Sequence, residues 1–333
     1  MTPSDAPNRH SRRGLIVPFA IVGLFLIGWT VWWFVLARQV ETQAANRIEA
    51  LRQSGWTVET ARRSVDGWPF RVRLDLGETR ITAPSGHGIE TSRLITQANA
   101  WAPLAWVAIA PEDLILTRPD KGRVRISGDG ARMSLVGIDK PWPRFALELI
   151  RPTFTPVGQA EAFPVSRAEH VSLEAKPGPQ DQAVDVLFQM VEGRGRAGGP
   201  VEGVTDSGLL SARVEFRMQN AEGLRTPSDD GLMAGWSRSG GRFTHVRGIL
   251  ESGENRALIE SSDLSAREDG RLEGRVTMRA DRPAAVVAGL AGGGEGAARL
   301  AGAAGSEVAL TLEFRDGRAF LGPFAVAPAP RLF

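Results

Sequence analysis

The sequence contains no cysteine. This absence excludes a disulfide framework, a thiolate metal site and a cysteine nucleophile. A chain of 333 residues can bury enough apolar surface to rest on its hydrophobic core alone. The missing disulfides are therefore compatible with a folded domain outside the cytoplasm.

Histidine is also scarce, and the four that occur show no metal-ligand spacing: His10, His87, His170 and His245. The chain has no Gly-x-Ser-x-Gly nucleophile elbow and no phosphate-binding P-loop. Residues 292–297 fit a loose dinucleotide-binding pattern, but no strand–helix–strand unit surrounds them. We therefore expect no catalytic residues, no metal and no cofactor, and a protein that is not an enzyme.

Tyrosine is absent and only three lysines occur, so arginine supplies nearly all the positive charge. The formal net charge is only +2, although the isoelectric point is about 9.6. With no tyrosine or cysteine to titrate, that small excess of arginine keeps the isoelectric point high. Neither a basic cluster nor an aromatic platform accompanies it, so we expect no nucleic-acid partner.

Charge is absent altogether from one long apolar run, Leu15 to Ala37. Its 23 residues, at about 1.5 Å each, can cross a bilayer core of roughly 30 Å as one helix. Basic residues tend to stay in the cytoplasm, and tryptophans gather at the headgroup level. The run is preceded by Arg9, Arg12 and Arg13 and ends around Trp29, Trp32 and Trp33. The sequence thus predicts a single-pass inner-membrane protein with residues 1–14 in the cytoplasm, residues 15–37 in the membrane and residues 38–333 in the periplasm.

Two other interpretations of this run are weaker. A cleaved signal peptide has a shorter apolar core, roughly 7–15 residues, before a small-residue cleavage site. Residues 42–44 could serve as that site, but the apolar run is too long and ends in too many aromatics. A buried helix of a soluble protein would show a polar face, which is missing here. A retained signal anchor is favoured.

After the anchor, apolar residues recur at helical spacing at Val40, Ala44, Ile48 and Leu51. This pattern predicts a stalk helix over residues 38–54 that continues the membrane span and stops at Ser54-Gly55. A coiled coil would need three or more heptads, and at most two are present. We therefore expect this apolar face to pack on the folded domain.

From Trp56 onward the apolar period changes from 3.6 to 2, which indicates antiparallel strands with one dry face. Such runs occur at Val72/Leu74/Leu76, Val124/Ile126, Phe145/Leu147/Leu149, Val171/Leu173, Val184/Val186, Val214/Phe216/Met218, Val276/Met278 and Val308/Leu310/Leu312/Phe314. Residues 127–130 and Asp316-Gly317 are expected to be hairpin links. Short helices are expected at residues 231–239 and, as a pair, within residues 282–304.

The predicted fold is mainly β: a large curved antiparallel sheet over residues 55–333, with a few short helices and a possible subdomain break near residues 195–208. Two stacked sheets would form a closed sandwich, whereas one bent sheet would leave an apolar groove. The sequence leaves both open.

Three local signatures are more particular. They are Asp66-Gly67-Trp68-Pro69-Phe70-Arg71, Trp101-Ala102-Pro103-Leu104-Ala105-Trp106, and Leu321-Gly322-Pro323-Phe324 with the later Pro328-Ala329-Pro330-Arg331-Leu332. With the N-terminal anchor, the chain resembles an uncharacterised alphaproteobacterial envelope protein family, the domain of unknown function 2125. The resemblance covers residues from about Gly55 to the end. It implies an inner-membrane anchor with a periplasmic β domain and brings no activity.

The residues of these signatures also have structural interpretations. Gly67 should supply a turn conformation closed to other residues, and Pro69 should precede a strand where its missing N–H does no harm. Trp68, Phe70 and Trp101 are expected in the core, because large aromatics more often pack than bind ligands. The prolines at the C-terminal end, including Pro323 and Pro330, should stop the last strand from pairing further.

Three functions remain. We favour the binding of a lipid or another apolar ligand in a β groove, because many strands have one apolar face and few helices are available to cover them. The alternative is a structural or scaffolding subunit that docks another envelope protein. A hydrolase using carboxylates has the weakest support, since its only candidates are adjacent acids typical of polar loops: Glu112, Asp113, Asp229 and Asp230.

Overall fold

The computed structural model describes residues 13–180, 182–199, 201, 208–225, 230–280 and 308–333. A single long helix, α1 (Arg13–Gln53), opens the described chain and spans 41 residues. The predicted stalk is therefore confirmed as a direct continuation of the apolar run. The helix ends where Ser54 N–H donates to the Ala50 carbonyl at 3.1 Å and Gly55 adopts a φ of 87°. By length and composition α1 is able to cross a membrane.

The remainder is one large antiparallel sheet, with twenty-two strands among the described residues. The predicted mainly β fold is confirmed. The sheet is bent into two limbs. In pairing order, the shorter limb contains β1 (Thr57–Thr60), β4 (Thr79–Thr82), β5 (Gly88–Thr91), β8 (Leu114–Arg118), β9 (Gly122–Ser127), β12 (Thr153–Val157) and β13 (Val165–Arg167).

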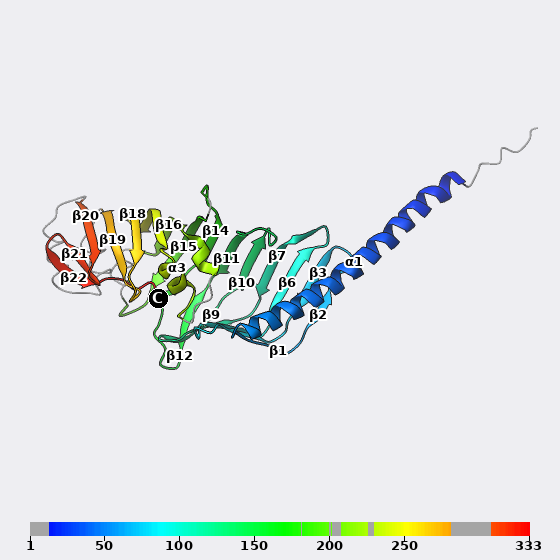
Figure 1. The fold of residues 1–333 in the computed structure, drawn as a ribbon, viewed down its shortest axis with the longest axis horizontal. Coiled ribbons are helices and arrows are strands. Elements are labelled where there is room, and N and C mark those ends of the chain that lie inside the picture. The colour runs from blue at the N-terminus through cyan, green and yellow to red at the C-terminus, as the bar shows by residue number, and fades with distance from the viewer. Residues whose placement is uncertain (1–12, 181, 200, 202–207, 226–229, 281–307) are drawn as a thin grey trace, which may run out of the picture.

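The longer limb begins beside α1 and runs to the C-terminal end of the chain (Figure 1). In pairing order it contains β2 (Ser64–Asp66), β3 (Arg71–Asp75), β6 (Ile95–Asn99), β7 (Ala102–Ala110), β10 (Ala131–Val136), β11 (Arg144–Ile150), β14 (His170–Pro177), β15 (Val184–Gly195), β16 (Leu210–Gln219), β17 (Arg242–Ser252), β18 (Asn255–Ala266), β19 (Leu272–Ala280), β20 (Val308–Arg315), β21 (Arg318–Leu321) and β22 (Phe324–Pro328). Every pairing in both limbs is antiparallel.

The two limbs meet along a line that we call the crease. The chain crosses it between β1 and β2, β3 and β4, β5 and β6, β7 and β8, β9 and β10, β11 and β12, and β13 and β14. Backbone hydrogen bonds continue across this line, as where Arg151 N–H donates to the Glu169 carbonyl at 2.8 Å. The end of β15 also reaches over the crease, because its residues 194–195 pair with β13 while residues 184–191 pair with β14. The sheet is thus one bent sheet.

One of the two expected hairpins is wrong. Residues 127–130 do not join paired strands, since β9 pairs with β8 and β12 whereas β10 pairs with β7 and β11. They carry the chain across the crease, where a Cβ on Gly128 would lie 2.6 Å from the Ile150 carbonyl oxygen. Glycines at this point permit either a hairpin turn or a sharp bend. Which of the two forms depends on which strands β9 and β10 pair with. The second hairpin is confirmed, because Asp316-Gly317 joins the paired strands β20 and β21.

Two short helices lie on the longer limb. The 3-10 helix η1 (Ala221–Arg225) follows β16, and α3 (Leu232–Arg238) precedes β17. The helix expected at residues 231–239 is therefore confirmed, whereas the pair expected within residues 282–304 lies outside the described residues. The fully buried Trp236 fixes α3 to the sheet: its indole N–H donates to the Gln219 carbonyl at 2.8 Å, and its ring lies 4.6 Å from that of Phe243.

Candidate functional site

The inner face of the longer limb has a continuous apolar row. Each member pairs directly with the next across neighbouring strands, so all point to the same side of the sheet. The row consists of Val72, Ala98, Trp106, Leu135, Phe145, Ala175, Val186 and Phe216. It starts on β3, the second strand of the longer limb, beside α1, and ends on β16, next to α3.

Both ends of this row are covered by helices. At the first end Trp33, Leu36 and Ala37 of α1 pack on Val72 and Ala100, and all five are buried. At the other end Trp236 of α3 packs in one cluster with Val186 and Phe243. Figure 1 shows α1 and α3 in front of the sheet, with strands β6, β7, β10 and β11 between them.

The middle of the inner face is only partly buried. Trp106, Leu135 and Phe145 are of intermediate exposure, as is Leu147 on the next row. Met133, which pairs with Leu147, is 37% exposed. An apolar face that stays half open in this way can accept further apolar groups from a ligand or a partner.

The shorter limb turns its own apolar residues to the same interior. Along it Val58, Ile81, Ile89, Leu116 and Val124 are successive cross-strand partners. At the crease, residues of both limbs line one small cavity of about 10 Å³. Leu114 and Ile126 come from the shorter limb, and Ala131 and Leu149 from the longer. The apolar faces of the two limbs therefore lie on the inside of the bend.

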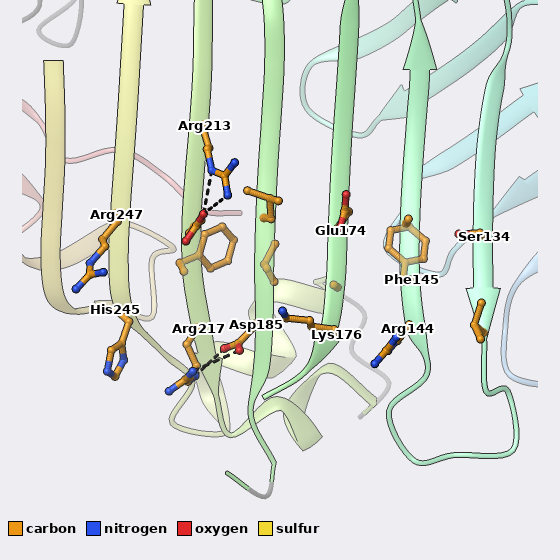
Figure 2. A pocket seen from close by; sticks show the side chains of 17 residues that line it. Ser134, Arg144, Phe145, Glu174, Lys176, Asp185, Arg213, Arg217, His245 and Arg247 are labelled. Carbon is orange, nitrogen blue, oxygen red and sulfur yellow. Dashed lines mark hydrogen bonds and ion pairs between the residues drawn. The ribbon is translucent and has the colours of Figure 1, made fainter. Parts of the chain in front are cut away.

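The outer face of the longer limb is polar. A trough of about 660 Å³ on this face runs across β10, β11 and β14 to β17. Figure 2 shows the side chains that line it. Five basic and three acidic side chains line it: Arg144, Lys176, Arg213, Arg217, Arg247, Glu174, Asp185 and Glu215. Charged residues on this face alternate along each strand with apolar residues on the inner face, as expected for a sheet with one face in water.

Ion pairs tie this outer surface together. Arg217 donates to both carboxylate oxygens of Asp185, at 2.6 and 3.3 Å, and this hydrogen bonding raises the pKa of the guanidinium. Arg213 donates to one oxygen of Glu215 at 2.9 and 2.6 Å. Both pairs lie across or along strands, where they stabilise the register rather than shape a reaction centre.

A second set of ion pairs lies on the outer face of the shorter limb and beside the crease. Glu90 accepts from Arg80 and Arg123, and the hydrogen bond from Arg80 is the main cause that lowers its pKa. Asp75 accepts from Arg93 at 2.5 and 3.0 Å, which lowers the pKa of this carboxyl group.

The acids considered for hydrolysis are separated by the fold. Asp113 pairs with Arg125 at 2.9 Å, and Glu112 accepts from the Ser92 hydroxyl at 2.5 Å, both at the crease. Asp230 pairs with Arg238 of α3, whereas Asp229 lies outside the described residues. Within the described ranges no three histidine, aspartate or glutamate side chains gather at a distance that would hold a metal ion.

The Gly67–Arg71 signature forms the tip of the β2–β3 hairpin. Gly67 has a φ of 105°, and a Cβ on it would lie 2.6 Å from the Arg71 carbonyl oxygen, so the need for glycine is explained. The expectation that its aromatics are buried is wrong, because Trp68, Phe70 and Trp101 are 55%, 63% and 61% exposed. Each lies at the free tip of a hairpin, beyond the last paired residues and away from the crease.

The membrane-run tryptophans differ from one another in the structure. Trp29 and Trp33 donate their indole N–H groups to the carbonyls of Pro69 and Arg71, at 2.9 and 2.8 Å. Trp32 instead is 48% exposed and is not part of the buried cluster that Trp33 forms with the sheet. The tail arginines Arg9 and Arg12 lie outside the described residues, and α1 starts at Arg13.

At the other end of the sheet, β22 pairs only with β21 among the described strands. Gly322 has a φ of 58° in the turn before it, next to Pro323. Pro330 accepts a backbone hydrogen bond from Leu272 at 2.8 Å, which ties the C-terminal segment to β19. The proline-rich end therefore lies at a sheet edge, where proline blocks further pairing.

Comparison with known proteins connects this architecture to one family. The family described as an uncharacterized protein conserved in bacteria, domain of unknown function 2125, matches residues 33–330. No curated protein and no solved structure matches the chain. The matched range begins at the buried Trp33, so it includes the part of α1 that packs on the sheet.

Proposed function

Because the chain belongs to the uncharacterised bacterial family of the domain of unknown function 2125, which brings no activity with it, we propose a function from its geometry. The protein is an inner-membrane-anchored periplasmic binding protein that holds a lipid or another apolar ligand on the inner face of its bent sheet. It acts as a binding protein rather than an enzyme. The observation that carries this proposal is the half-exposed apolar surface between α1 and α3, centred on Met133, Leu135 and Phe145.

The chemistry of this surface favours an acyl chain. Burying one methylene group contributes about 0.8 kcal/mol, so a chain laid along several strands gains several times that amount. Its lining residues are aliphatic and aromatic, with no ionisable side chain in the row from Val72 to Phe216. A polar or charged ligand would find its partners only on the opposite face.

Retention of the membrane helix is supported by its packing. Cleavage near residues 42–44 would remove Trp33, Leu36 and Ala37, which cover Val72 and Ala100. The loss of Trp29 and Trp33 would also deprive the carbonyls of Pro69 and Arg71 of their indole N–H donors. Removal of a signal peptide should leave the core of the mature protein intact, whereas removal of α1 would expose part of this core. We therefore take α1 to be a permanent anchor.

The experiment places a photoreactive benzoylphenylalanine at Met133 in the full-length chain, expressed in bacterial cells. The matched control carries the same residue at Val191, which is 43% exposed but pairs with His170 on the outer face. After illumination, the purified protein is analysed by mass spectrometry for added mass. We expect acyl-lipid adducts at position 133 and none above background at position 191.

The same experiment tests the alternative function. A protein adduct of one dominant size at position 133 would reject ligand binding. It would instead support a scaffolding role, in which this face docks an envelope protein. Equal lipid adducts at both positions would show non-specific contact and reject the proposed site. Absence of any adduct at position 133 would reject both functions for this face.

A further inference from the structure

A group of exposed apolar side chains of the longer limb lies at its free tips next to α1. We call this group the rim: Trp68, Phe70, Trp101, Leu104 and Ile138. Phe70 and Trp101 make an edge-to-face ring contact at 6.5 Å. Gly137 N–H donates to the Leu104 carbonyl at 2.9 Å, which brings the β10–β11 connection beside β7. The rim is thus one continuous surface across three hairpin connections.

The rim is joined directly to the helix. Trp29 Nε1 donates to the carbonyl of Pro69, the residue between Trp68 and Phe70. One turn later Trp33 Nε1 donates to the carbonyl of Arg71, where β3 begins. The level of the rim along α1 is therefore fixed at residues 29–33, and the helix continues beyond it toward its N-terminal end (Figure 1).

The length of α1 beyond this level is too short for a bilayer. Leu15 to Gly28 is 14 residues, or about 21 Å of helix at ~1.5 Å per residue. A hydrocarbon core of roughly 30 Å needs about six residues more. Those six are residues 29–34, the segment that is docked against the rim.

The docked segment has the exposure that immersion requires. On the side away from the sheet, Val31, Trp32, Phe34 and Val35 are all exposed, whereas Trp33 is buried toward the sheet. A docked helix segment that ends in water would be expected to carry polar residues on that outer side. This segment has none before Arg38.

We infer that the rim is immersed in the headgroup and upper acyl region of the bilayer that α1 spans. Tryptophan and phenylalanine are suited to that region, where an apolar ring meets a polar boundary. The rim holds the longer limb against the membrane, so that the inner face adjoins the acyl chains at the base of the helix. This inference rests on the retained anchor of the proposed function and does not depend on any bound ligand.

The absence of cysteine makes a direct test possible. Single-cysteine variants Phe70→Cys and Trp101→Cys of the full-length protein are labelled with an environment-sensitive nitrobenzoxadiazole dye. Val191→Cys, exposed at the crease, is the matched control, and Leu24→Cys reports on the membrane span. The proteins are reconstituted in phosphatidylethanolamine and phosphatidylglycerol vesicles, with or without spin-labelled lipids. The label is at a shallow acyl position for the dyes at positions 70, 101 and 191, and near the acyl end for the dye at position 24.

We expect the dyes at positions 70 and 101 to lose most of their fluorescence with spin-labelled lipid, while the dye at position 191 keeps it. Equal quenching at positions 70, 101 and 191, with position 24 quenched, would overturn the immersion of the rim but retain the anchor. No quenching at position 24 either would remove the anchor itself. Blue-shifted emission at the rim without lipid quenching would show that protein covers it, which also refutes the inference.

Substitution at an exposed tip should leave the fold intact, and thermal unfolding of each variant in detergent verifies this. If either rim variant unfolds early, Leu104→Cys and Ile138→Cys replace it, since both are exposed members of the same rim. The same comparison with Val191→Cys then decides the outcome.

Discussion

The two adjacent tryptophans of α1 allow a sharp test of how the helix is attached to the sheet. Trp33 is 5% exposed, packs on Val72 and donates to the Arg71 carbonyl at 2.8 Å. Trp32 is 48% exposed and lies outside the buried cluster of Trp33. Replacing each by alanine removes the same side chain from the same helix, so helix propensity and membrane hydrophobicity change equally.

The expected cost differs greatly between the two positions. Truncating a buried tryptophan to alanine typically costs about 3–5 kcal/mol. Of this, about 0.5–1.5 kcal/mol belongs to the hydrogen bond, which Trp33→Phe removes while most of the ring packing is kept. Trp32→Ala should change stability by no more than about 0.5 kcal/mol in detergent, because the side chain has few protein contacts to lose.

The loss should be local, because the main contacts of α1 among the described elements are with β1, β2 and β3. Hydrogen–deuterium exchange of the full-length protein in detergent, read on peptides that cover residues 64–75, reports the opening of β2 and β3. At about 1.4 kcal/mol per factor of ten, Trp33→Ala should speed exchange there by about 10² to several times 10³. Peptides from β16 to β18 in the same sample serve as the internal reference and should exchange as in the unaltered protein.

The order of effects should be Trp33→Ala, then Trp33→Phe, then Trp32→Ala. If Trp32→Ala accelerated exchange as much as Trp33→Ala, the helix would not be held by the buried face, and the argument for its retention would fail. The same conclusion would follow if Trp33→Ala left residues 64–75 fully protected.

Three further predictions concern the fold and its pH dependence. Gly67→Ala should lower stability by about 1–3 kcal/mol, since its φ of 105° and a carbonyl oxygen 2.6 Å from the new Cβ both oppose a side chain. Thermal unfolding compares it with Gly158→Ala, where φ is also positive, at 66°, but a Cβ meets nothing within 4 Å, so the difference between the two variants reports the close carbonyl oxygen. Trp236→Phe should cost about 1–3 kcal/mol, because a buried carbonyl loses its indole donor, and urea unfolding should show a lower midpoint with an unchanged slope. Asp75 has a pKa below its unfolded value of 3.8, mainly because it accepts a hydrogen bond from Arg93. The stabilisation that ionised Asp75 contributes is therefore complete above pH 3.8 and is lost as the pH falls through the pKa of the folded state. Asp75→Asn should reduce the loss of stability at acid pH, measured as the free energy of unfolding against pH. An unchanged acid dependence would contradict this role of Asp75.

The local patterns of the sequence predicted the secondary structure well. Alternation identified β3, β9, β11, β14, β15, β16, β19 and β20, because a strand with one dry face must repeat every two residues. The uncharged run and the spacing after it predicted α1 as one continuous helix. The two-residue Asp316-Gly317 link fixed a hairpin because it supplies the positive φ angles that such a turn requires.

The crease could not be predicted from these local patterns. A bend such as residues 127–130 has the composition of a hairpin turn, and only the partners of β9 and β10, many residues away in the chain, show that these strands never pair. A weak signal exists, since a glycine or a proline stands at some of the crossings, as at Gly128 and Pro152. That signal locates a break but does not give its direction.

The exposure of aromatics was likewise decided by tertiary structure. Composition and periodicity established a cysteine-free chain with one apolar helix and a sheet that is dry on one side. They could not distinguish Trp33 from Trp32, or a core tryptophan such as Trp236 from the exposed Trp101. A side chain is buried when another element lies opposite it. Here the bend of the sheet and the path of α1 across its first strands determine which of these tryptophans are buried.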